Sequence, residues 1–329
     1  MTTLYTPSRL LEMINDYLAG MPYARSPQGL YDPIRYELSL GGKRVRPVLM
    51  LMAYNLYRDD VERILPQAAG LETYHNHTLL HDDLMDKADM RRNKPTVHNV
   101  WNENTAILSG DAMLILAYRL VSDAPEDKLK EVLDVFTRTT MEICEGQQWD
   151  MEFEKRMDVT VDEYIEMIRL KTSVLLAAAL RIGACMAEAP AADASALYDF
   201  GVKMGLAFQL QDDWLDVYGD PRVFGKNIGG DILCNKKTFM LITALAEADE
   251  RRRAELEHWL SMGEKEVCPE EKIAAVTRLY DELGIGDRCI ALSDRYYKEG
   301  LDILDRVALP DERKAALRGY ACGLMNRKL

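Results

Sequence analysis

The feature that most constrains this fold is the helical periodicity of the apolar residues, which continues through almost the whole chain. Strand signals are nearly absent, since there is no sustained two-residue alternation of β-branched residues and no Asn-Gly or Asp-Gly hairpin. No linker rich in Gly, Ser or Pro interrupts the pattern, and no internal repeat is evident. The sequence therefore predicts one all-α domain over residues 1–329, with about a dozen helices.

Capping signals place several helix starts. Thr6-Pro7 and Asp32-Pro33 each place an N-cap residue before a proline at the first helical position, and Thr160 with Glu163 forms a capping box. The pattern predicts helices over residues 7–18, 33–40, 46–57, 61–87, 104–122, 126–154, 160–187, 192–218, 237–250, 270–284, 287–307 and 311–326.

Charge and cysteine content exclude several classes of protein. The chain carries 41 Lys and Arg against 54 Asp and Glu, a net charge of −13, which argues against a nucleic-acid partner. Its six cysteines show no CxxC pair, so we expect reduced thiols and a cytoplasmic protein. No basic and apolar leader is visible, and no apolar run approaches the roughly 20 residues of a membrane span.

Two acidic clusters of the form Asp-Asp-x-x-Asp fall in the last turns of long predicted helices. The first and last aspartates of each cluster lie within about 40° on a helix, one turn apart. Carboxylates stacked at the negative end of a helix dipole repel each other, and Mg²⁺ would relieve that cost. The alternative, a solvated acidic helix end, suits one cluster better than a matching pair. The clusters are Asp82-Asp83-Leu84-Met85-Asp86 and Asp212-Asp213-Trp214-Leu215-Asp216.

Basic residues are interleaved with these clusters along the chain. Residues 41–47 place three cations at a helix start, where backbone N–H groups favour an anion. Taken singly, the paired arginines could be surface charge, Lys171 could reach out of an apolar face, and His75 could be a core histidine. Together the cations indicate diphosphate bound through Mg²⁺; they are Lys43, Arg44, Arg46, Arg91, Arg92, Lys171, Lys226, Lys236 and Lys237.

These motifs resemble the trans-isoprenyl (polyprenyl) diphosphate synthases of the farnesyl and geranylgeranyl type, from about residue 31 to the C-terminus. The resemblance implies an all-α bundle of the isoprenoid-synthase type around a deep central cavity, and a homodimer. It implies a prenyltransferase that uses three Mg²⁺ ions to join isopentenyl diphosphate, head to tail (1′-4), to dimethylallyl, geranyl or farnesyl diphosphate. The residues that carry it are 41–47, His75, 82–92, Lys171-Thr172, 208–216, Lys226 and Lys236.

The same resemblance implies a role for each matching residue. Asp82 and Asp86 would ligate two ions and Asp212 the third, with Asp83, Asp213 and Asp216 acting more through water. The allylic diphosphate would be held by Arg91, Lys171, Thr172, Gln209, Lys226 and Lys236. Isopentenyl diphosphate would be held by Lys43, Arg46, His75 and Arg92, with added charge from Arg327.

Two departures from the family pattern stand out. Asn93 replaces a glycine that commonly follows the paired arginines, and asparagine tolerates a positive φ. The first cluster also lacks two extra residues found in many bacterial farnesyl synthases, which disfavours an assignment to farnesyl diphosphate alone.

Residues just upstream of the first cluster limit chain growth in this family. Tyr74, His77 and Thr78 form a stripe beside the aspartate face, and the two bulky groups predict a product of fifteen or twenty carbons. On the second long helix, Gly201 and Gly205 are expected to leave room for the isoprenoid tail.

Three alternatives stay open at this point. A terpene cyclase shares the fold but usually replaces the second aspartate cluster and needs no isopentenyl site. A non-catalytic subunit of a heteromeric synthase would be expected to lose aspartates. An acidic Ca²⁺-binding or scaffold protein would leave the interleaved cations without a purpose.

Overall fold

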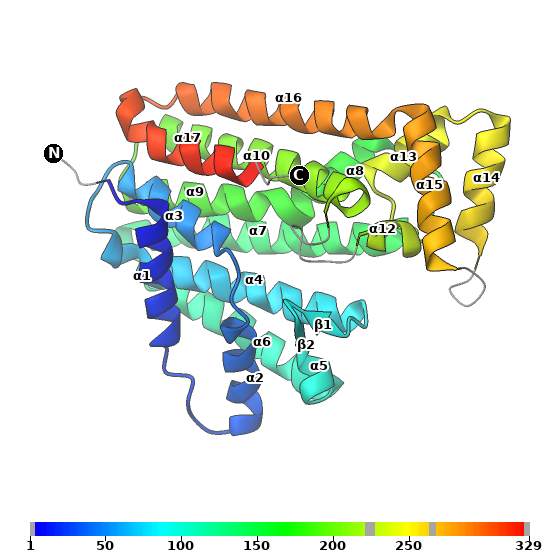
Figure 1. Cartoon of the computed structure of the whole chain (residues 1–329). Coiled ribbons are helices and arrows are strands. Elements are labelled where there is room, and N and C mark those ends of the chain that lie inside the picture. Colours follow the sequence, from blue (N-terminus) through cyan, green and yellow to red (C-terminus); the bar gives the residue numbers. More distant parts are fainter. Residues whose placement is uncertain (1–3, 221–227, 263–267, 326–329) are drawn as a thin grey trace. The chain divides into compact units, whose positions relative to one another are not determined.

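The computed structural model describes residues 4–220, 228–262 and 268–325, and these residues are almost entirely helical (Figure 1). They form two compact units. The first comprises residues 4–138, 178–198 and 307–317; the second comprises the described residues of 139–177, 199–306 and 318–325. Within the described ranges no helix combines the length and apolarity that a bilayer crossing requires. The all-α prediction is confirmed.

The first unit is organised around two neighbouring helices, α4 and α6, which run side by side (Figure 1). An apolar core joins them to the preceding helices through Ile34, Leu38, Leu80, Ala106 and Met113. Its elements are α1 (Pro7–Ala19), α2 (Gln28–Ser39), α3 (Val45–Asn55), a 3-10 turn (Val61–Ile64), α4 (Leu65–Met85), β1 (Met90–Arg91), β2 (Lys94–Pro95), α5 (Val97–Val100), α6 (Glu103–Val121) and the first part of α7 (Glu126–Phe153).

The second unit has its own apolar core, which includes Leu210, Leu241, Leu279 and Ile285. Helices α7, α9, α10 and α17 each contribute residues to both units. The remaining elements are α8 (Val161–Ile168), a π-helical turn (Arg169–Ser173), α9 (Val174–Met186), α10 (Ala191–Tyr218), α12 (Gly230–Leu233), α13 (Phe239–Glu247), α14 (Glu250–Ser261), α15 (Pro269–Leu283), α16 (Ile285–Asp305) and α17 (Asp311–Met325).

Most predicted helices are present, and the capping box of Thr160 and Glu163 forms reciprocally at the start of α8. The predicted start at Pro33 is wrong, because α2 begins at Gln28 and contains that proline. Pro33 is the sixth residue of α2, beyond the first four positions whose N–H groups have no intrahelical partner, so the helix goes without the one backbone hydrogen bond that this position would donate. Helix α14 was not predicted because it is highly charged and buries only Leu256, so it lacks an apolar stripe.

A short hairpin with a two-residue turn follows the first aspartate cluster, where no strand was predicted. Strands β1 and β2 pair Met90 with Pro95 and Arg91 with Lys94. The turn residues Arg92 and Asn93 have φ angles of 51° and 61°. Two consecutive positive φ values match the twist of a tight hairpin, and the predicted tolerance of Asn93 for this conformation is confirmed.

Candidate active site

The first aspartate cluster closes α4, with Asp86 as its C-cap residue. Asp82 is half-buried and Asp86 exposed, whereas Asp83 is buried and turned inward. Arg91 of the hairpin donates from Nε and Nη2 to the two Asp83 oxygens, at 2.7 and 2.6 Å. Burial raises the pKa of Asp83 above its ordinary value, and the guanidinium offsets part of that rise. Asp83 therefore anchors the hairpin, while Asp82 and Asp86 occupy the more accessible face.

The second cluster lies at the end of α10 and belongs to a buried polar chain in the second unit. Asp213 accepts hydrogen bonds from the Tyr164 hydroxyl and from Gln209 Nε2, the latter at 3.0 Å. Thr172 Oγ1 donates to Gln209 Oε1 at 3.1 Å. Burial, with the charge of Asp231 added, raises the pKa of Asp213 to about 8. The chain fixes the amide orientation of Gln209, because its NH₂ group faces Asp213 and its carbonyl oxygen faces Thr172.

The structure thus brings Thr172, Gln209 and Asp213 together as one group. Tyr164 joins them and was not singled out in the sequence, where it appeared only as an apolar position of α8. The last aspartate of the cluster, Asp216, accepts the backbone N–H of Asp231 at 2.9 Å. Asp216 therefore also holds the start of α12 close to the end of α10.

Lys171 lies on the π-helical turn and pairs with Asp150 of α7, with Nζ and Oδ2 2.7 Å apart. Burial alone would raise the pKa of Asp150, but the charges of Lys171 and Lys236 outweigh burial and hold the pKa below its ordinary value. Asp150 was missed in the sequence because it is one of many acidic residues on α7. π-Helical turns are frequent at functional sites, which agrees with the predicted roles of Lys171 and Thr172.

Glycines on the neighbouring helices allow close approach to this turn. A Cβ atom at Gly205 would lie 2.5 Å from the Cα of Ser173, and one at Gly146 would lie 2.4 Å from the backbone nitrogen of Lys171. The prediction that Gly205 leaves room for an isoprenoid tail is therefore wrong. The space beside Gly205 is filled by the π-helical turn itself.

The exposed Lys236 lies on a loop that is fixed by a buried lysine of α15. Lys272 donates from Nζ to Asn235 Oδ1 at 2.7 Å and to the Leu233 carbonyl at 3.2 Å. Asn235 adopts a φ of 54°, and its carbonyl accepts from Lys237 Nζ at 3.2 Å. Neither Lys272 nor Asn235 was predicted from the sequence. Two other predicted cations, Lys226 and Arg327, lie outside the described residues.

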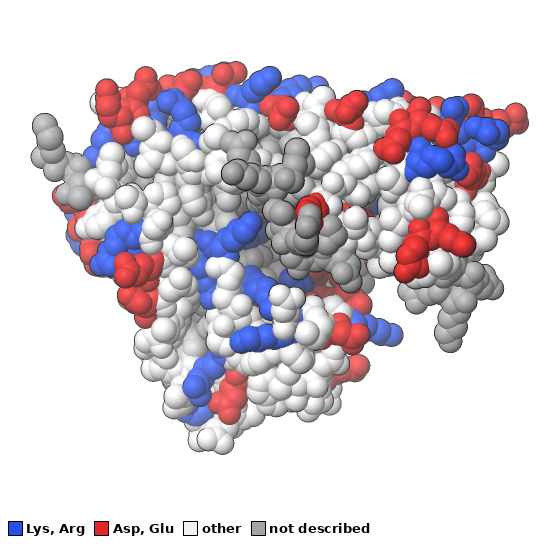
Figure 2. All heavy atoms as spheres, viewed as in Figure 1, with Lys and Arg blue, Asp and Glu red and all other residues white. Residues whose placement is uncertain are grey.

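A basic loop between α2 and α3 forms a second group of predicted residues. Figure 2 shows Lys and Arg side chains gathered over this loop on the face of the first unit. Gly41 and Gly42 have φ angles of 82° and 120°. Arg92 donates to the Gly41 carbonyl, and a Cβ at Gly42 would lie 2.7 Å from the Arg92 guanidinium carbon. Only glycine at position 42 permits this approach without displacing Arg92.

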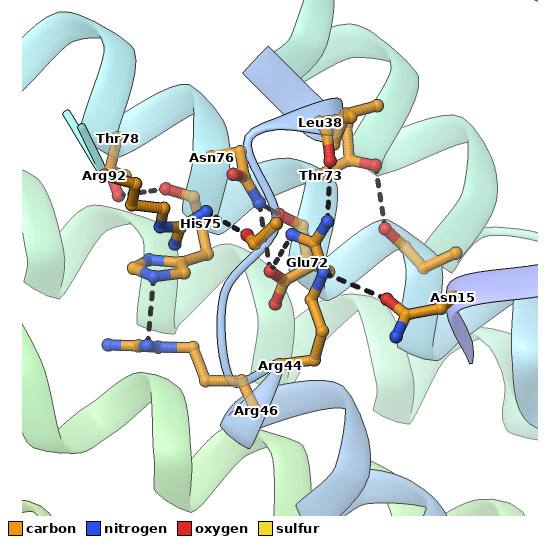
Figure 3. Close-up of polar contacts among 12 residues, drawn as sticks. Asn15, Leu38, Arg44, Arg46, Glu72, Thr73, His75, Asn76, Thr78 and Arg92 are labelled. Atoms are coloured by element: carbon orange, nitrogen blue, oxygen red, sulfur yellow. Dashed lines mark hydrogen bonds and ion pairs between the residues drawn. The ribbon is translucent and has the colours of Figure 1, made fainter. Parts of the chain in front are cut away.

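Arg46 Nη1 lies 3.1 Å from His75 Nε2 (Figure 3). Burial and then the surrounding arginines, Arg46 foremost, lower the pKa of His75 well below its ordinary value, so the ring is neutral at pH 7. Because arginine only donates, Nε2 is the acceptor and the ring proton resides on Nδ1. The structure therefore brings Arg46, His75 and Arg92 together, with Lys43 exposed on the loop before α3.

The residues expected to limit product length lie about one to two helical turns before Asp82 on α4. Tyr74 is 2% exposed and meets Phe136 edge-on, with ring centroids 5.5 Å apart. His77 Nδ1 donates to the Gly110 carbonyl of α6 at 2.9 Å, and burial lowers its pKa to about 4. Thr78 donates to the His75 carbonyl at 2.8 Å. Tyr74 and His77 are thus fixed by neighbouring helices, with their centroids 5.6 Å apart.

The two clusters offer only carboxylate oxygens, the ligand type that Mg²⁺ prefers. Among the described residues, no three His, Cys, Asp or Glu side chains converge as a complete metal site. Protein Mg²⁺ sites commonly use one or two carboxylates and take further ligands from water and substrate phosphates. Asp82 and Asp86, one turn apart and accessible, fit such a site.

Comparisons with known proteins identify the family to which this chain belongs. The polyprenyl synthetase family model matches residues 27–279. A short chain isoprenyl diphosphate synthase of Methanocaldococcus jannaschii is 43% identical over 80% of this chain and 79% of that protein. A geranylgeranyl pyrophosphate synthase crystal structure has 41% identity and a TM-score of 0.94, covering 99% of this chain and 100% of that one. A Corynebacterium glutamicum geranylgeranyl pyrophosphate synthase, with isoprenyl diphosphate and magnesium, has 27% identity, a TM-score of 0.84 and 98% coverage of both chains.

The chain therefore belongs to the polyprenyl synthetase family, whose members are magnesium-dependent prenyltransferases. Within that family it is a short-chain trans-isoprenyl diphosphate synthase, which condenses isopentenyl diphosphate with an allylic diphosphate.

Proposed function

We propose that this chain, as one catalytic domain over residues 1–329, makes a trans-isoprenyl diphosphate of fifteen or twenty carbons. The allylic substrate is dimethylallyl, geranyl or farnesyl diphosphate. The observation that carries the proposal is the presence of two aspartate clusters, one in each unit. Each ends a long helix, and each is linked to a cationic group or polar chain suited to diphosphate.

In this proposal three Mg²⁺ ions bind per active site, two at Asp82 and Asp86 and the third at Asp212. Asp83, Asp213 and Asp216 support these ligands indirectly, through the hydrogen bonds described above. When bound, Mg²⁺ stabilises the negative charge that develops on the leaving diphosphate.

The allylic diphosphate is held by Arg91, Lys171 and Lys236, with Lys226 as a further cation. When the allylic C–O bond breaks, its electron pair leaves with the diphosphate, where these fixed charges stabilise it. The Thr172 hydroxyl and the Gln209 carbonyl present weak dipoles to the allylic cation. Asp213 and Tyr164 support that role, because they hold the Gln209 amide in one orientation.

Isopentenyl diphosphate is held by Lys43, Arg46 and Arg92, with His75 donating from Nδ1–H. The isopentenyl double bond attacks the allylic carbon, which forms the new C–C bond and leaves a tertiary cation. That cation loses a proton to the released diphosphate, so no enzymic base is needed. Exclusion of water prevents hydrolysis of the allylic cation.

The test is incubation of the purified protein with Mg²⁺, labelled isopentenyl diphosphate and each allylic diphosphate in turn. We expect products of fifteen or twenty carbons by chromatography, and loss of turnover when a chelator removes the metal. Cyclic hydrocarbon, or no consumption of isopentenyl diphosphate with any starter, would overturn the proposal.

Replacing Tyr74 with alanine is expected to lengthen the product by about one isoprene unit, because the residue lies one helical turn, about 5.4 Å, behind Thr78. His77→Ala should act in the same direction. Product lengths read by chromatography test this expectation, with Tyr118→Ala on α6 as a control for loss of a ring that also contacts Phe136. Unchanged lengths in both variants would show that these side chains do not limit the chain.

We further propose that the enzyme is a cytoplasmic homodimer that joins through α6. Ile107, Leu108 and Ile115 of this helix are 46%, 60% and 69% exposed. Burying the exposed part of each side chain favours association by a fraction of the about 1.5–3 kcal/mol that full burial of such a side chain contributes. Sedimentation should give a dimer for the native chain and a monomer for Leu108→Asp/Ile115→Asp. Met157→Asp, at a 49% exposed methionine of the second unit, serves as the control. A native monomer, or an unaffected double variant, would contradict this expectation.

A further inference from the structure

Arg44 belongs to the basic loop between α2 and α3, yet its side chain is 4% exposed and points into the first unit. All three guanidinium nitrogens donate within the protein (Figure 3). Nη1 binds Glu72 at 2.8 Å, Nη2 binds the Leu38 carbonyl at 2.6 Å, and Nε lies 3.4 Å from Asn15 Oδ1. A side chain so enclosed cannot contact a diphosphate.

We infer that Arg44 is a positioning residue for isopentenyl diphosphate, acting through its buried ion pair with Glu72. This inference rests on the proposed binding of that substrate by Lys43, Arg46, His75 and Arg92. The ion pair joins the loop that carries Lys43, and the first turn of α3 that carries Arg46, to the helix that carries His75.

The backbone around Arg44 explains why an anchor is needed. Gly41, Gly42 and Arg44 all have positive φ, at 82°, 120° and 48°, and residues 41–44 belong to no helix or strand. Arg44 is also the N-cap residue of α3, and its side chain does not cap that helix. The Arg44 side chain, together with the contact of Arg92 with the Gly41 carbonyl, therefore helps to fix Lys43 and the turn of α3 that carries Arg46.

The partner of Arg44 is equally fixed. Glu72 is 2% exposed and accepts a second hydrogen bond from Asn76 Nδ2 at 3.1 Å. Glu72 precedes His75 by three residues on α4, so the two side chains lie on neighbouring positions of one face. The Arg44–Glu72 pair thus fixes the position of the loop relative to the His75 ring, which accepts a hydrogen bond from Arg46 (Figure 3).

A purely stabilising role is less consistent with this geometry. A buried ion pair commonly adds little net stability, because desolvating the two charges offsets their attraction. Losing one partner is costly mainly because the other charge stays buried. The cost of an unpaired charge and the loss of positioning can therefore be separated by removing both charges.

The experiment compares Arg44→Met, Glu72→Gln and the double variant, with steady-state kinetics for each substrate and urea denaturation of each protein. Both single variants should be less stable than the native chain, and the double variant should regain most of that stability. All three should raise the KM for isopentenyl diphosphate by about 10- to 100-fold. The KM for the allylic diphosphate should change by no more than about twofold, since its ligands lie elsewhere.

Lys43→Met provides a comparison for loss of a direct contact, and Arg35→Met removes an exposed arginine of α2 and should change nothing. A double variant that recovers both stability and the native KM would overturn the inference, as would equal changes in both KM values. If the single variants do not fold, the stability and the two KM values of the double variant alone test the inference. A native protein that does not condense the two substrates refutes the proposed function instead.

Discussion

Replacing Asp82 with alanine is expected to lower kcat on the order of 10³-fold, with little change in the free energy of unfolding. The carboxylate is half-buried at the end of α4, where it stands against the negative end of the helix dipole. Its removal therefore relieves local repulsion while it deletes a ligand of the proposed magnesium ions. Initial rates at saturating substrates and a titration with Mg²⁺ measure the effect.

Two variants make this result specific. Asp134→Ala removes an exposed carboxylate of α7 and should leave the rate unchanged. Asp82→Asn keeps the shape of the side chain but not its charge, so it should resemble the alanine variant. Near-native activity of Asp82→Ala would exclude the metal role assigned to the first cluster.

Replacing Lys171 with methionine should lower kcat by about 10²- to 10³-fold and raise the KM for the allylic diphosphate. The KM for isopentenyl diphosphate should stay close to its native value. The variant should also lose about 1–3 kcal/mol of stability, because Asp150 keeps a partly buried charge without its 2.7 Å partner. Separate kinetics for each substrate and urea denaturation give the three quantities.

The double variant Lys171→Met/Asp150→Asn separates the two effects. It should regain most of the lost stability, because no unpaired carboxylate remains, and it should stay as inactive as the single variant. Recovery of turnover in the double variant would show that Lys171 serves only to neutralise Asp150.

Much of the helical framework could be predicted from the sequence, because apolar residues at a 3.6-residue period identify buried helix faces without knowledge of their partners. The aspartate clusters could also be predicted from the sequence, since their internal spacing and their position at helix ends are local properties. The capping box at Thr160 belongs to the same class, and it formed as predicted.

Features that depend on contacts distant in sequence could not be predicted. Asp150 and Tyr164 matter through partners 21 and 49 residues away. The π-helical turn has no sequence signature here, and the glycine that accommodates it was misread as space for substrate. Arg44 was counted among the cations for diphosphate because the sequence places it between two basic residues, and only the fold turns it inward.

The hairpin after α4 has a consequence for how this enzyme can evolve. Consecutive arginines in this hairpin serve different neighbours, one reaching the Asp83 carboxylate and the next reaching the Gly41 carbonyl. A substitution that alters the turn at Asn93 would therefore disturb both proposed diphosphate sites at once. Residues at this position are restricted to those few, such as glycine, asparagine and aspartate, that accept the left-handed backbone without strain.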